Sequence, residues 1–306
     1  MIVSDLTSDV VHARLKQNDF RFKIGPFSIA LQSPFRQVAD AVHQLYADYR
    51  LLDGDQFIDF PVKVAPPGSL RRWYRPQTLF SFNQFKPFKP LPADQAFAFF
   101  EWGLNWCVAS NAHQYVIIHS AVIAKNDLAI IMPGTPGSGK STLCAAMMLS
   151  GWRLLSDEMA LLNPDTLHLT PVPRPVSLKN QSIDIIGQRQ PGIAFGPIAH
   201  DTAKGTVSHI AATPSCIANA ETPAVPRLLI LPKYKKDAAT TLTPLSKATA
   251  FMEMMENTFN YHVIGKDSGE LIKQLLESVA CYQLSYSDLD DAMQNLENLL
   301  QEPTRG

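Results

Sequence analysis

The chain has 306 residues, of which 46% are hydrophobic, and its formal net charge at pH 7 is −1. A chain of this length is typical of about two domains and buries enough apolar surface to fold without disulfides. A net charge near zero gives no electrostatic attraction toward DNA, RNA or an anionic membrane. We therefore expect no nucleic-acid partner and no membrane association.

The cysteines and the first residues of the chain favour a reducing compartment. Cys107, Cys144, Cys216 and Cys281 form no C-x-x-C pair and no metal-ligand spacing, which predicts buried thiols. The N-terminal stretch lacks the apolar core of a signal peptide, and no apolar run reaches the ~18 residues of a membrane span. We therefore expect a cytoplasmic protein.

The N-terminal part of the chain is rich in aromatic residues and prolines and mixes short strand patterns with helix patterns. Arg21 to Gln32 alternates around Gly25-Pro26, which predicts a hairpin. Residues 93–109 carry apolar side chains at helical spacing, which predicts a helix. We place a domain boundary beside this helix, so that residues 1–110 form an N-terminal α+β accessory region.

Residues 111–306 are predicted to form a second domain with an α/β pattern. Tyr115 to Ala124 and Leu128 to Met132 are apolar runs that predict two strands. A helix pattern follows and ends near Gly151, where glycine suits the C-terminal cap. Trp152 to Ser156 predicts the next strand.

A glycine-rich loop, GTPGSGKST, lies between the second strand and the helix. It matches G-x-x-x-x-G-K-[ST], with Gly134, Gly139, Lys140 and Ser141 at the fixed positions. Glycines let backbone N–H groups turn inward around a phosphate, and the following helix adds its positive N-terminal end. Lys140 is expected to bridge the β- and γ-phosphates of ATP, and the Ser141 hydroxyl to ligate Mg²⁺. The predicted nucleotide-binding residues are Gly134, Thr135, Pro136, Gly137, Ser138, Gly139, Lys140, Ser141 and Thr142.

Two carboxylates end the strand after this helix. Asp157 and Glu158 follow the run WRLLS, where P-loop proteins place one carboxylate that holds Mg²⁺ and one that takes the nucleophile's proton. The alternative is a solvated turn. His119 lies in the middle of the first predicted strand, and a lone histidine there is either a satisfied core residue or a catalytic group.

Taken together, residues 115–162 resemble the catalytic domain of HPr kinase/phosphorylase. The element order and spacing of that family are kept in IIHSAVIAKNDLAIIMPGTPGSGKSTLCAAMMLSGWRLLSDE. The family's histidine falls on His119, its P-loop on Gly134 to Ser141, and its aspartate pair on Asp157 and Glu158. The resemblance to the family extends over about residues 113–265.

The chain departs from that family at several positions. Ser120 stands where the family has glycine, Thr142 where it has glutamate, and Glu158 where it has the second aspartate. The EIRGxGI signature is absent, and PRPVSLK (residues 173–179) stands near its place. This combination, with the aromatic N-terminal region, is similar to the HprK-related kinase A group.

The resemblance implies a phosphoenolpyruvate-carboxykinase-like P-loop fold, ATP with Mg²⁺, and phosphorylation of a hydroxyl. HPr kinases act on a serine of a small protein, and some relatives act on ribosomally made peptides. Without the signature, the resemblance implies neither the phosphate-releasing reverse reaction nor the hexameric assembly of HPr kinases.

Other cations are weaker candidates for a phosphate contact. Arg174, Lys179 and Lys204 each lie beside a Pro or Gly turn, and the alternative for each is a surface cation on a loop. The cluster RRWYR, Arg71 to Arg75, could bind an acidic peptide, although an edge strand with snorkelling arginines is the stronger expectation. Residues 183–223 are predicted to be mostly loop.

The interpretation that unites these features is an ATP-dependent kinase with an α/β P-loop domain of the HPr kinase type. Asp157 is the candidate base, Glu158 supports Mg²⁺, and His119 orients Asp157 or the transferring phosphate, although the two carboxylates are interchangeable in these roles. The acceptor hydroxyl belongs to a peptide, a small protein or a small molecule. The alternative is a nucleotide-sensing partner protein without kinase activity, and a homo-oligomer stays open.

Overall fold

The computed structural model describes residues 1–54, 56–135 and 137–302. The chain forms two compact units, each built from two segments of the sequence. The first unit contains Met1–Val108 and Arg174–Ile217, and the second contains Ala109–Pro173 and Ala218–Gly306. The described residues form a mixed α/β structure with several sheets.

The division into units differs from the predicted one in the middle of the chain. The chain passes from the first unit to the second after Val108, close to the predicted boundary at residue 110. The sequence predicts one continuous domain over 111–306, but the segment 174–217 folds with the first unit. The reason is long-range pairing: the segment builds a sheet of its own, and Arg174 forms an ion pair with Glu101 of the N-terminal region.

The first unit contains a five-stranded sheet with the strand order β1-β2-β3-β4-β5. Its strands are β1 (Arg21–Ile24), β2 (Phe27–Gln32), β3 (Phe60–Ala65), β4 (Gln77–Phe82) and β5 (Leu91–Pro92). Its N-terminal helical elements are η1 (Val3–Asp5), α1 (Ser8–Gln17), α2 (Arg36–Leu45), η2 (Leu70–Arg72), η3 (Ala93–Gln95) and α3 (Ala96–Asn111).

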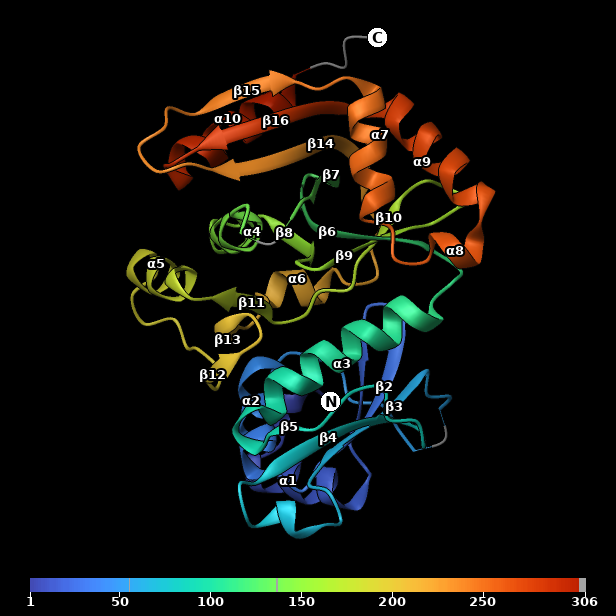
Figure 1. Ribbon diagram of the computed structural model, residues 1–306, viewed down its shortest axis with the longest axis vertical. Coiled ribbons are helices and arrows are strands. Elements are labelled where there is room, and N and C mark those ends of the chain that lie inside the picture. Colours follow the sequence, from blue (N-terminus) through green and yellow to red (C-terminus); the bar gives the residue numbers. More distant parts are fainter. Residues whose placement is uncertain (55, 136, 303–306) are drawn as a thin grey trace. The chain divides into compact units, whose positions relative to one another are not determined.

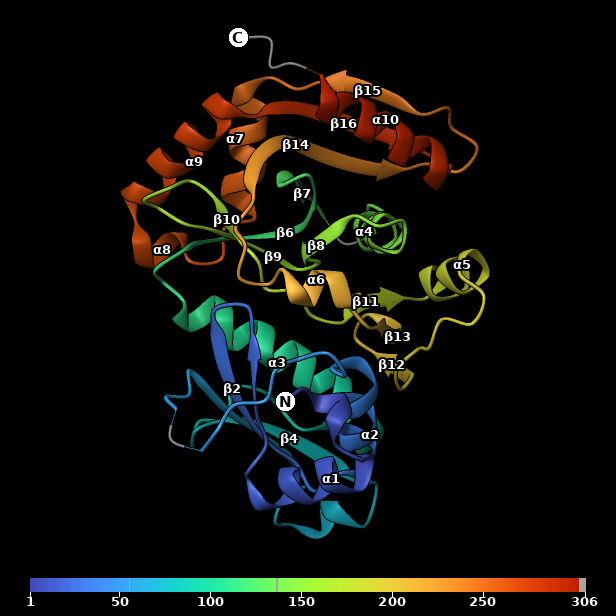
Figure 2. The same cartoon turned by 180° about the vertical axis from the view of Figure 1, so that it is seen from behind.

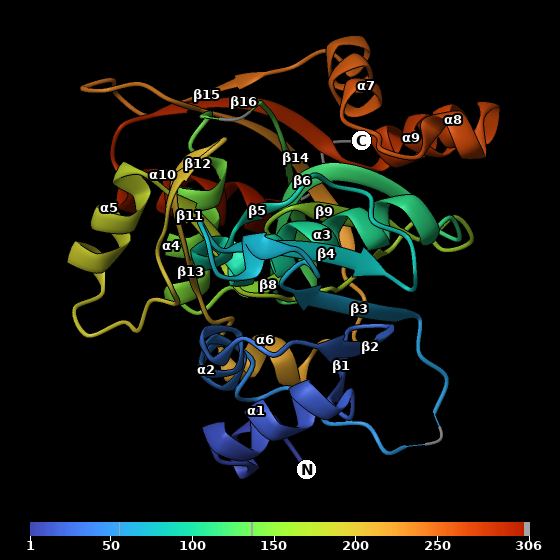
Figure 3. The same cartoon turned by 60° about the horizontal axis from the view of Figure 1, so that its bottom comes forward.

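The predicted hairpin and helix are both present. β1 and β2 pair antiparallel, and Gly25 makes the turn with φ of +53°, a conformation that glycine adopts without a Cβ clash. α3 covers the predicted helix, and its buried side chains include Phe97, Phe100 and Leu104. Figure 3 shows α1, α2 and the strands β1 to β3 together at the blue end of the chain.

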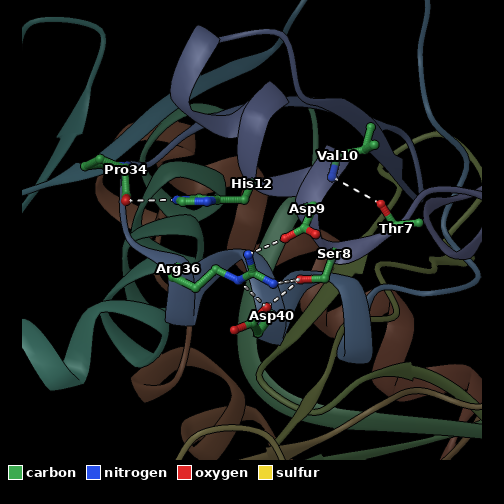
Figure 4. A network of polar contacts seen from close by, with 8 residues as sticks. All are labelled: Thr7, Ser8, Asp9, Val10, His12, Pro34, Arg36 and Asp40. Atoms are coloured by element: carbon green, nitrogen blue, oxygen red, sulfur yellow. Dashed lines mark hydrogen bonds and ion pairs between the residues drawn. The ribbon is translucent and has the colours of Figure 1, made fainter.

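A polar network joins α1 and α2 on the exposed side of the first unit (Figure 4). Arg36 of α2 donates to Asp9 of α1 at 2.5 Å and to Asp40 at 2.9 Å, and Ser8 bonds Asp40. His12 contacts the Pro34 carbonyl at 3.2 Å. Because both side chains of each Arg36 ion pair are about half exposed or more, the network orients the two helices and adds little stability.

The second segment of the first unit carries more regular structure than the sequence predicts. Its elements are β11 (Val176–Lys179), α5 (Gln181–Arg189), β12 (Ala199–Thr202), β13 (Gly205–Ile210) and α6 (Pro214–Ala218). The strands form a sheet in the order β11-β13-β12. The prediction of a mostly loop segment is therefore wrong: cross-strand pairing, which local composition does not report, makes strands of these short polar-rich runs.

The second unit is built on one large sheet with the order β10-β9-β6-β7-β14-β16-β15, and β8 pairs β6. The strands are β6 (Val116–Lys125), β7 (Leu128–Pro133), β8 (Arg153–Ser156), β9 (Met159–Leu162), β10 (Leu169–Thr170), β14 (Val225–Tyr234), β15 (Thr241–Pro244) and β16 (Ala280–Tyr286). The helices are α4 (Lys140–Leu149), α7 (Lys247–Glu256), α8 (Tyr261–Ile264), α9 (Lys266–Ser278) and α10 (Leu289–Gln301).

Both faces of this sheet are buried. Alternate residues of the central strands, including Ile118, Val122 and Ile131, pack in one cluster with side chains of α7 and α9. Residues of the opposite parity, such as Ile123 and Ile130, are also fully buried. α4 contacts β6 and β8, and α10 contacts α4 and β16 (Figure 2). Such burial explains why the strand patterns are continuous apolar runs.

The buried-thiol prediction is confirmed for all four cysteines. Burial raises the pKa of the Cys107 thiol to about 12 and raises the pKa of Cys281 as well. In the described part of the chain, no helix has both the length and the apolar character needed to cross a bilayer.

Candidate nucleotide site

The glycine-rich loop connects β7 to α4, as the sequence predicts. β7 is parallel to β14, and β14 is parallel to β16, so the carboxyl ends of these three strands meet at the edge where the loop begins (Figure 1). Ligands of open α/β sheets bind outside the carboxyl ends of the strands. The loop therefore lies at the edge of the sheet where a ligand is expected.

The loop has the backbone conformations that its glycines permit. Gly134, Gly137 and Gly139 have φ of +150°, +87° and +92°. A Cβ on Gly139 would lie 2.4 Å from the Tyr286 hydroxyl oxygen, so this position has no room for a side chain. Pro136 lies outside the described residues, and Thr135 and Gly137 are exposed.

Lys140 points back into the loop from the first position of α4. Its Nζ lies 3.2 Å from the Gly134 carbonyl oxygen and 3.3 Å from Nε2 of His119, and the residue is 8% exposed. The ammonium group is thus already aimed at the glycine loop. Ser141 and Thr142 follow in the first turn of α4, half-buried, where backbone N–H groups and the helix dipole favour an anion.

His119 links Lys140 to the acidic pair. Its Nδ1 lies 3.0 Å from the backbone carbonyl oxygen of Glu158 and 3.7 Å from Glu158 Oε2. A carbonyl can only accept, so Nδ1 carries the proton and Nε2 presents a lone pair to the Lys140 ammonium. The ring also packs against Phe259 at 5.4 Å between centroids. Three residues far apart in the sequence therefore meet in one network.

Asp157 and Glu158 occupy a break between two strands that pair with the same neighbour. β8 pairs β6 at Ser156 and Val122, and β9 resumes the pairing at Met159 and His119. The Ser156 hydroxyl accepts hydrogen bonds from the backbone N–H groups of Glu158 (3.2 Å) and Met159 (3.0 Å). Asp157 is 2% exposed. The pair therefore does not form a solvated turn, which was the alternative from the sequence.

The residues predicted for Mg²⁺ have suitable chemistry. The Ser141 hydroxyl and the two carboxylates are oxygen donors, which Mg²⁺ prefers. The part of the chain that the structure describes holds no group of three or more His, Cys, Asp or Glu residues that could form a protein-only metal site.

Two tyrosines that were not predicted from the sequence support the loop from the β14 and β16 side. Tyr286 Oη donates to the Gly139 carbonyl at 3.1 Å, and the Tyr234 backbone N–H donates to the Ser138 carbonyl at 3.0 Å. Burial raises the pKa of Tyr286, so its phenol stays protonated as a donor. The available signal was weak: Tyr234 lies three residues after the apolar run RLLIL (residues 227–231), and Tyr286 ends the alternating run YQLSY (residues 282–286).

The weaker candidates have different places. Lys179 ends β11 and Lys204 lies in the turn between β12 and β13, both in the first unit, so their phosphate contacts stay a prediction. Arg174 is not a surface cation: it is 3% exposed, its Nη1 lies 3.5 Å from Glu101 Oε2, and it bonds the Asn105 side chain. Arg174 therefore forms a buried ion pair with Glu101, which is a structural role.

The RRWYR cluster is not an edge strand. It contains the end of η2 and the following turn, and Trp73 and Tyr74 are 71% and 67% exposed. Arg72 lies over the Trp73 ring at 4.9 Å. The prediction is wrong because the backbone here forms a 3₁₀ turn, capped by the Ser69 hydroxyl that accepts from the Arg71 N–H, and not an extended strand.

We expect Arg174→Ala to lower the free energy of unfolding by about 3–5 kcal/mol, because it leaves the 4% exposed Glu101 charge without this counterion. Chemical denaturation measures the change. The matched control is Arg36→Ala, which removes an exposed arginine of the same unit and should shift the unfolding midpoint far less. If a folded Arg174→Ala protein has unchanged stability but binds ATP·Mg more weakly, the result would favour the phosphate contact that the sequence predicts for Arg174.

Comparison with protein-family models gives no match for this chain, and comparison with curated proteins gives none either.

Proposed function

We propose that the chain is an ATP-dependent kinase of the P-loop type, which transfers the γ-phosphoryl group of ATP with Mg²⁺ to a hydroxyl. The observation that carries the proposal is the buried Lys140 ammonium, held against the Gly134 carbonyl at the carboxyl end of three parallel strands. A glycine loop, an inward lysine and a helix N-terminus are the parts that bind a nucleotide triphosphate.

The phosphates of ATP would bind inside the glycine-rich loop. The backbone N–H groups of the loop and of the first turn of α4 would bind the β-phosphate, since their glycine conformations leave the backbone uncovered. Lys140 would exchange its Gly134 contact for the β- and γ-phosphate oxygens. Ser141 and one carboxylate of the acidic pair would hold Mg²⁺, which supplies neutralisation of charge on the transferring group.

The transfer step uses the acidic pair. The acceptor hydroxyl oxygen forms a bond to Pγ, the bond from Pγ to the bridging oxygen of ADP breaks, and the hydroxyl proton passes to Asp157. Glu158 supports Mg²⁺ on this assignment. His119 contacts both Lys140 and Glu158, so it would hold these two groups at a fixed separation. His119 is therefore a positioning residue in the proposed mechanism.

The acceptor class follows from the resemblance to HPr kinase/phosphorylase over the strand, loop and acidic pair. On that basis we propose a Ser or Thr of a peptide or small protein in the cytoplasm, and a phosphoenolpyruvate-carboxykinase-like P-loop fold. A small-molecule acceptor uses the same chemistry. Incubation with labelled ATP and candidate acceptors, followed by identification of the labelled product, distinguishes them.

The first test is binding. ATP with Mg²⁺ should raise the melting temperature, and saturation at ~100 times Kd should add about 2.7 kcal/mol to the free energy of unfolding. Removing Mg²⁺ with EDTA should reduce the shift, because the ion shares its charge between the phosphates and the carboxylates. Nucleotide that copurifies with the protein is removed first and quantified by absorbance.

The control for this test is the same measurement with ATP omitted, so that an effect of Mg²⁺ alone is subtracted. No thermal shift at millimolar ATP and Mg²⁺, in protein shown to carry no nucleotide, contradicts the proposal.

A further inference from the structure

The segment that leaves β14 lies beside the glycine loop. β14 neighbours β7, the strand that leads into the loop, and the two are parallel. At the end of β14, the Tyr234 N–H donates to the Ser138 carbonyl at 3.0 Å. The segment and the loop are thus joined by a main-chain hydrogen bond, so Tyr234 has a fixed place relative to the loop.

The Tyr234 side chain combines a fixed position with an exposed ring. Its Cβ is 3.1 Å from the place that a Cβ on Gly139 would occupy, and its ring meets Tyr286 edge-on at 5.9 Å between centroids. Tyr286 is itself bonded to the Gly139 carbonyl. Tyr234 nevertheless remains 48% exposed. A ring that is held by its neighbours and open on one side is a surface on which a flat group can stack.

The two sides of the loop carry different chemistry. β7 has β6 on one side and β14 on the other. His119 belongs to β6, and the acidic pair lies in the break between β8 and β9, both of which pair with β6. On the proposed function, the reacting end of the nucleotide would lie on the β6 side. A nucleotide that extends away from this reacting end would pass the end of β14, where Tyr234 lies beside the loop.

The charge around Tyr234 also suits a nucleotide. Lys233, Lys235 and Lys236 flank it in sequence and are exposed, and none forms an ion pair with another described residue. Three cations in the segment that is bonded to the loop, against the one exposed carboxylate of Asp237, raise the local concentration of a polyanion such as a triphosphate. A base that stacks on an aromatic ring gains binding free energy whatever its edge pattern, because every base has a π face.

We propose that Tyr234 is the stacking surface for the nucleotide base, which makes the end of β14 the second half of the nucleotide site. The inference rests on the proposed function, because it needs a triphosphate in the glycine loop. It adds a residue and a ligand group that the phosphate motif does not specify.

The test compares ATP with inorganic triphosphate, both with Mg²⁺, by isothermal titration calorimetry. Tyr234→Ala should weaken ATP binding by about ten- to a hundredfold and leave inorganic triphosphate binding within about twofold of wild type. Tyr234→Phe is the matched control, because it keeps the ring and removes only the hydroxyl, and it should bind both ligands as wild type does. Melting curves without ligand verify that each variant is folded.

A second measurement uses the unaltered protein and does not depend on the folding of a variant. Ribose 5-triphosphate, which lacks only the base, should bind wild type at least about tenfold more weakly than ATP. Equal affinities for the two ligands would overturn the inference.

The outcomes separate the inference from the proposed function. If wild type binds ATP and triphosphate but Tyr234→Ala weakens neither, or weakens both equally, the stacking role is wrong and the phosphate site stands. If wild type binds neither ligand, the proposed function fails and the inference fails with it.

Discussion

Asp157→Asn is expected to lower the rate of phosphoryl transfer by about 10²–10⁴-fold. The amide keeps the shape of the side chain but cannot take the proton of the acceptor hydroxyl. Because Asp157 is only 2% exposed, bulk water does not readily replace it as the base. ATP·Mg affinity should change by less than about tenfold, or ~1.4 kcal/mol. Slow hydrolysis of ATP by water serves as the assay until the acceptor is identified.

Glu158→Gln is the matched control, since it makes the same carboxylate-to-amide change at the next residue. If Asp157 is the base, Glu158→Gln should chiefly raise the Mg²⁺ concentration needed for activity. If Glu158 is the base, the two variants exchange their phenotypes. Glu158 and His119 are in contact, so their substitutions should not be additive. We expect a His119 substitution to lower turnover less in the Glu158→Gln variant than in wild type, and a double-mutant cycle measures this coupling.

The same pair of variants separates the kinase from a nucleotide-sensing protein. In a sensor, one of the two substitutions would lower the affinity for Mg²⁺. Neither would lower turnover, because a sensor does not catalyse phosphoryl transfer. If ATP binds wild type but neither hydrolysis nor transfer responds to either substitution, the proposed mechanism is wrong and the sensor is the better interpretation.

The local parts of the site could be predicted from the sequence, and the reason is physical. The glycine loop and the helix behind it are one contiguous segment whose conformation depends on residues with special φ values, so Gly134, Gly139 and Lys140 are visible as a pattern. The strand patterns on either side were also correct in place, because both faces of that sheet are buried and the runs are uniformly apolar.

The non-local parts could not be predicted in this way. Which strand lies beside β7 depends on pairing with β14, almost a hundred residues later in the chain, and no local pattern encodes that order. Tyr234 and Tyr286, which end β14 and β16, were therefore not predicted to lie beside the loop. The same reason applies to Arg174, whose partner Glu101 lies on α3. A cation beside a proline gives no sign of a buried carboxylate elsewhere in the sequence.

Lys140→Ala is expected to weaken ATP·Mg binding and to lower turnover by about two to three orders of magnitude. The ammonium group is preorganised: its Nζ contacts Gly134 at 3.2 Å and His119 at 3.3 Å, and little of it is exposed. Loss of one preorganised charge contact to the transferring group typically costs this much. Calorimetric titration with ATP·Mg measures the affinity, and the hydrolysis assay measures turnover.

Two control variants separate the charge from packing. Lys140→Met keeps an unbranched apolar stem of similar length in the buried site, so it should lose the same affinity and turnover while retaining more stability than the alanine variant. Lys273→Ala removes a lysine of the same unit whose side chain is 61% exposed beside Glu270, and it should bind and turn over as wild type does. A folded Lys140→Met protein with unchanged ATP affinity and turnover would rule out the glycine loop as the nucleotide site. In that case the contact between Lys140 and His119 would only help to hold the fold together, because the Lys140 ammonium would interact with no ligand.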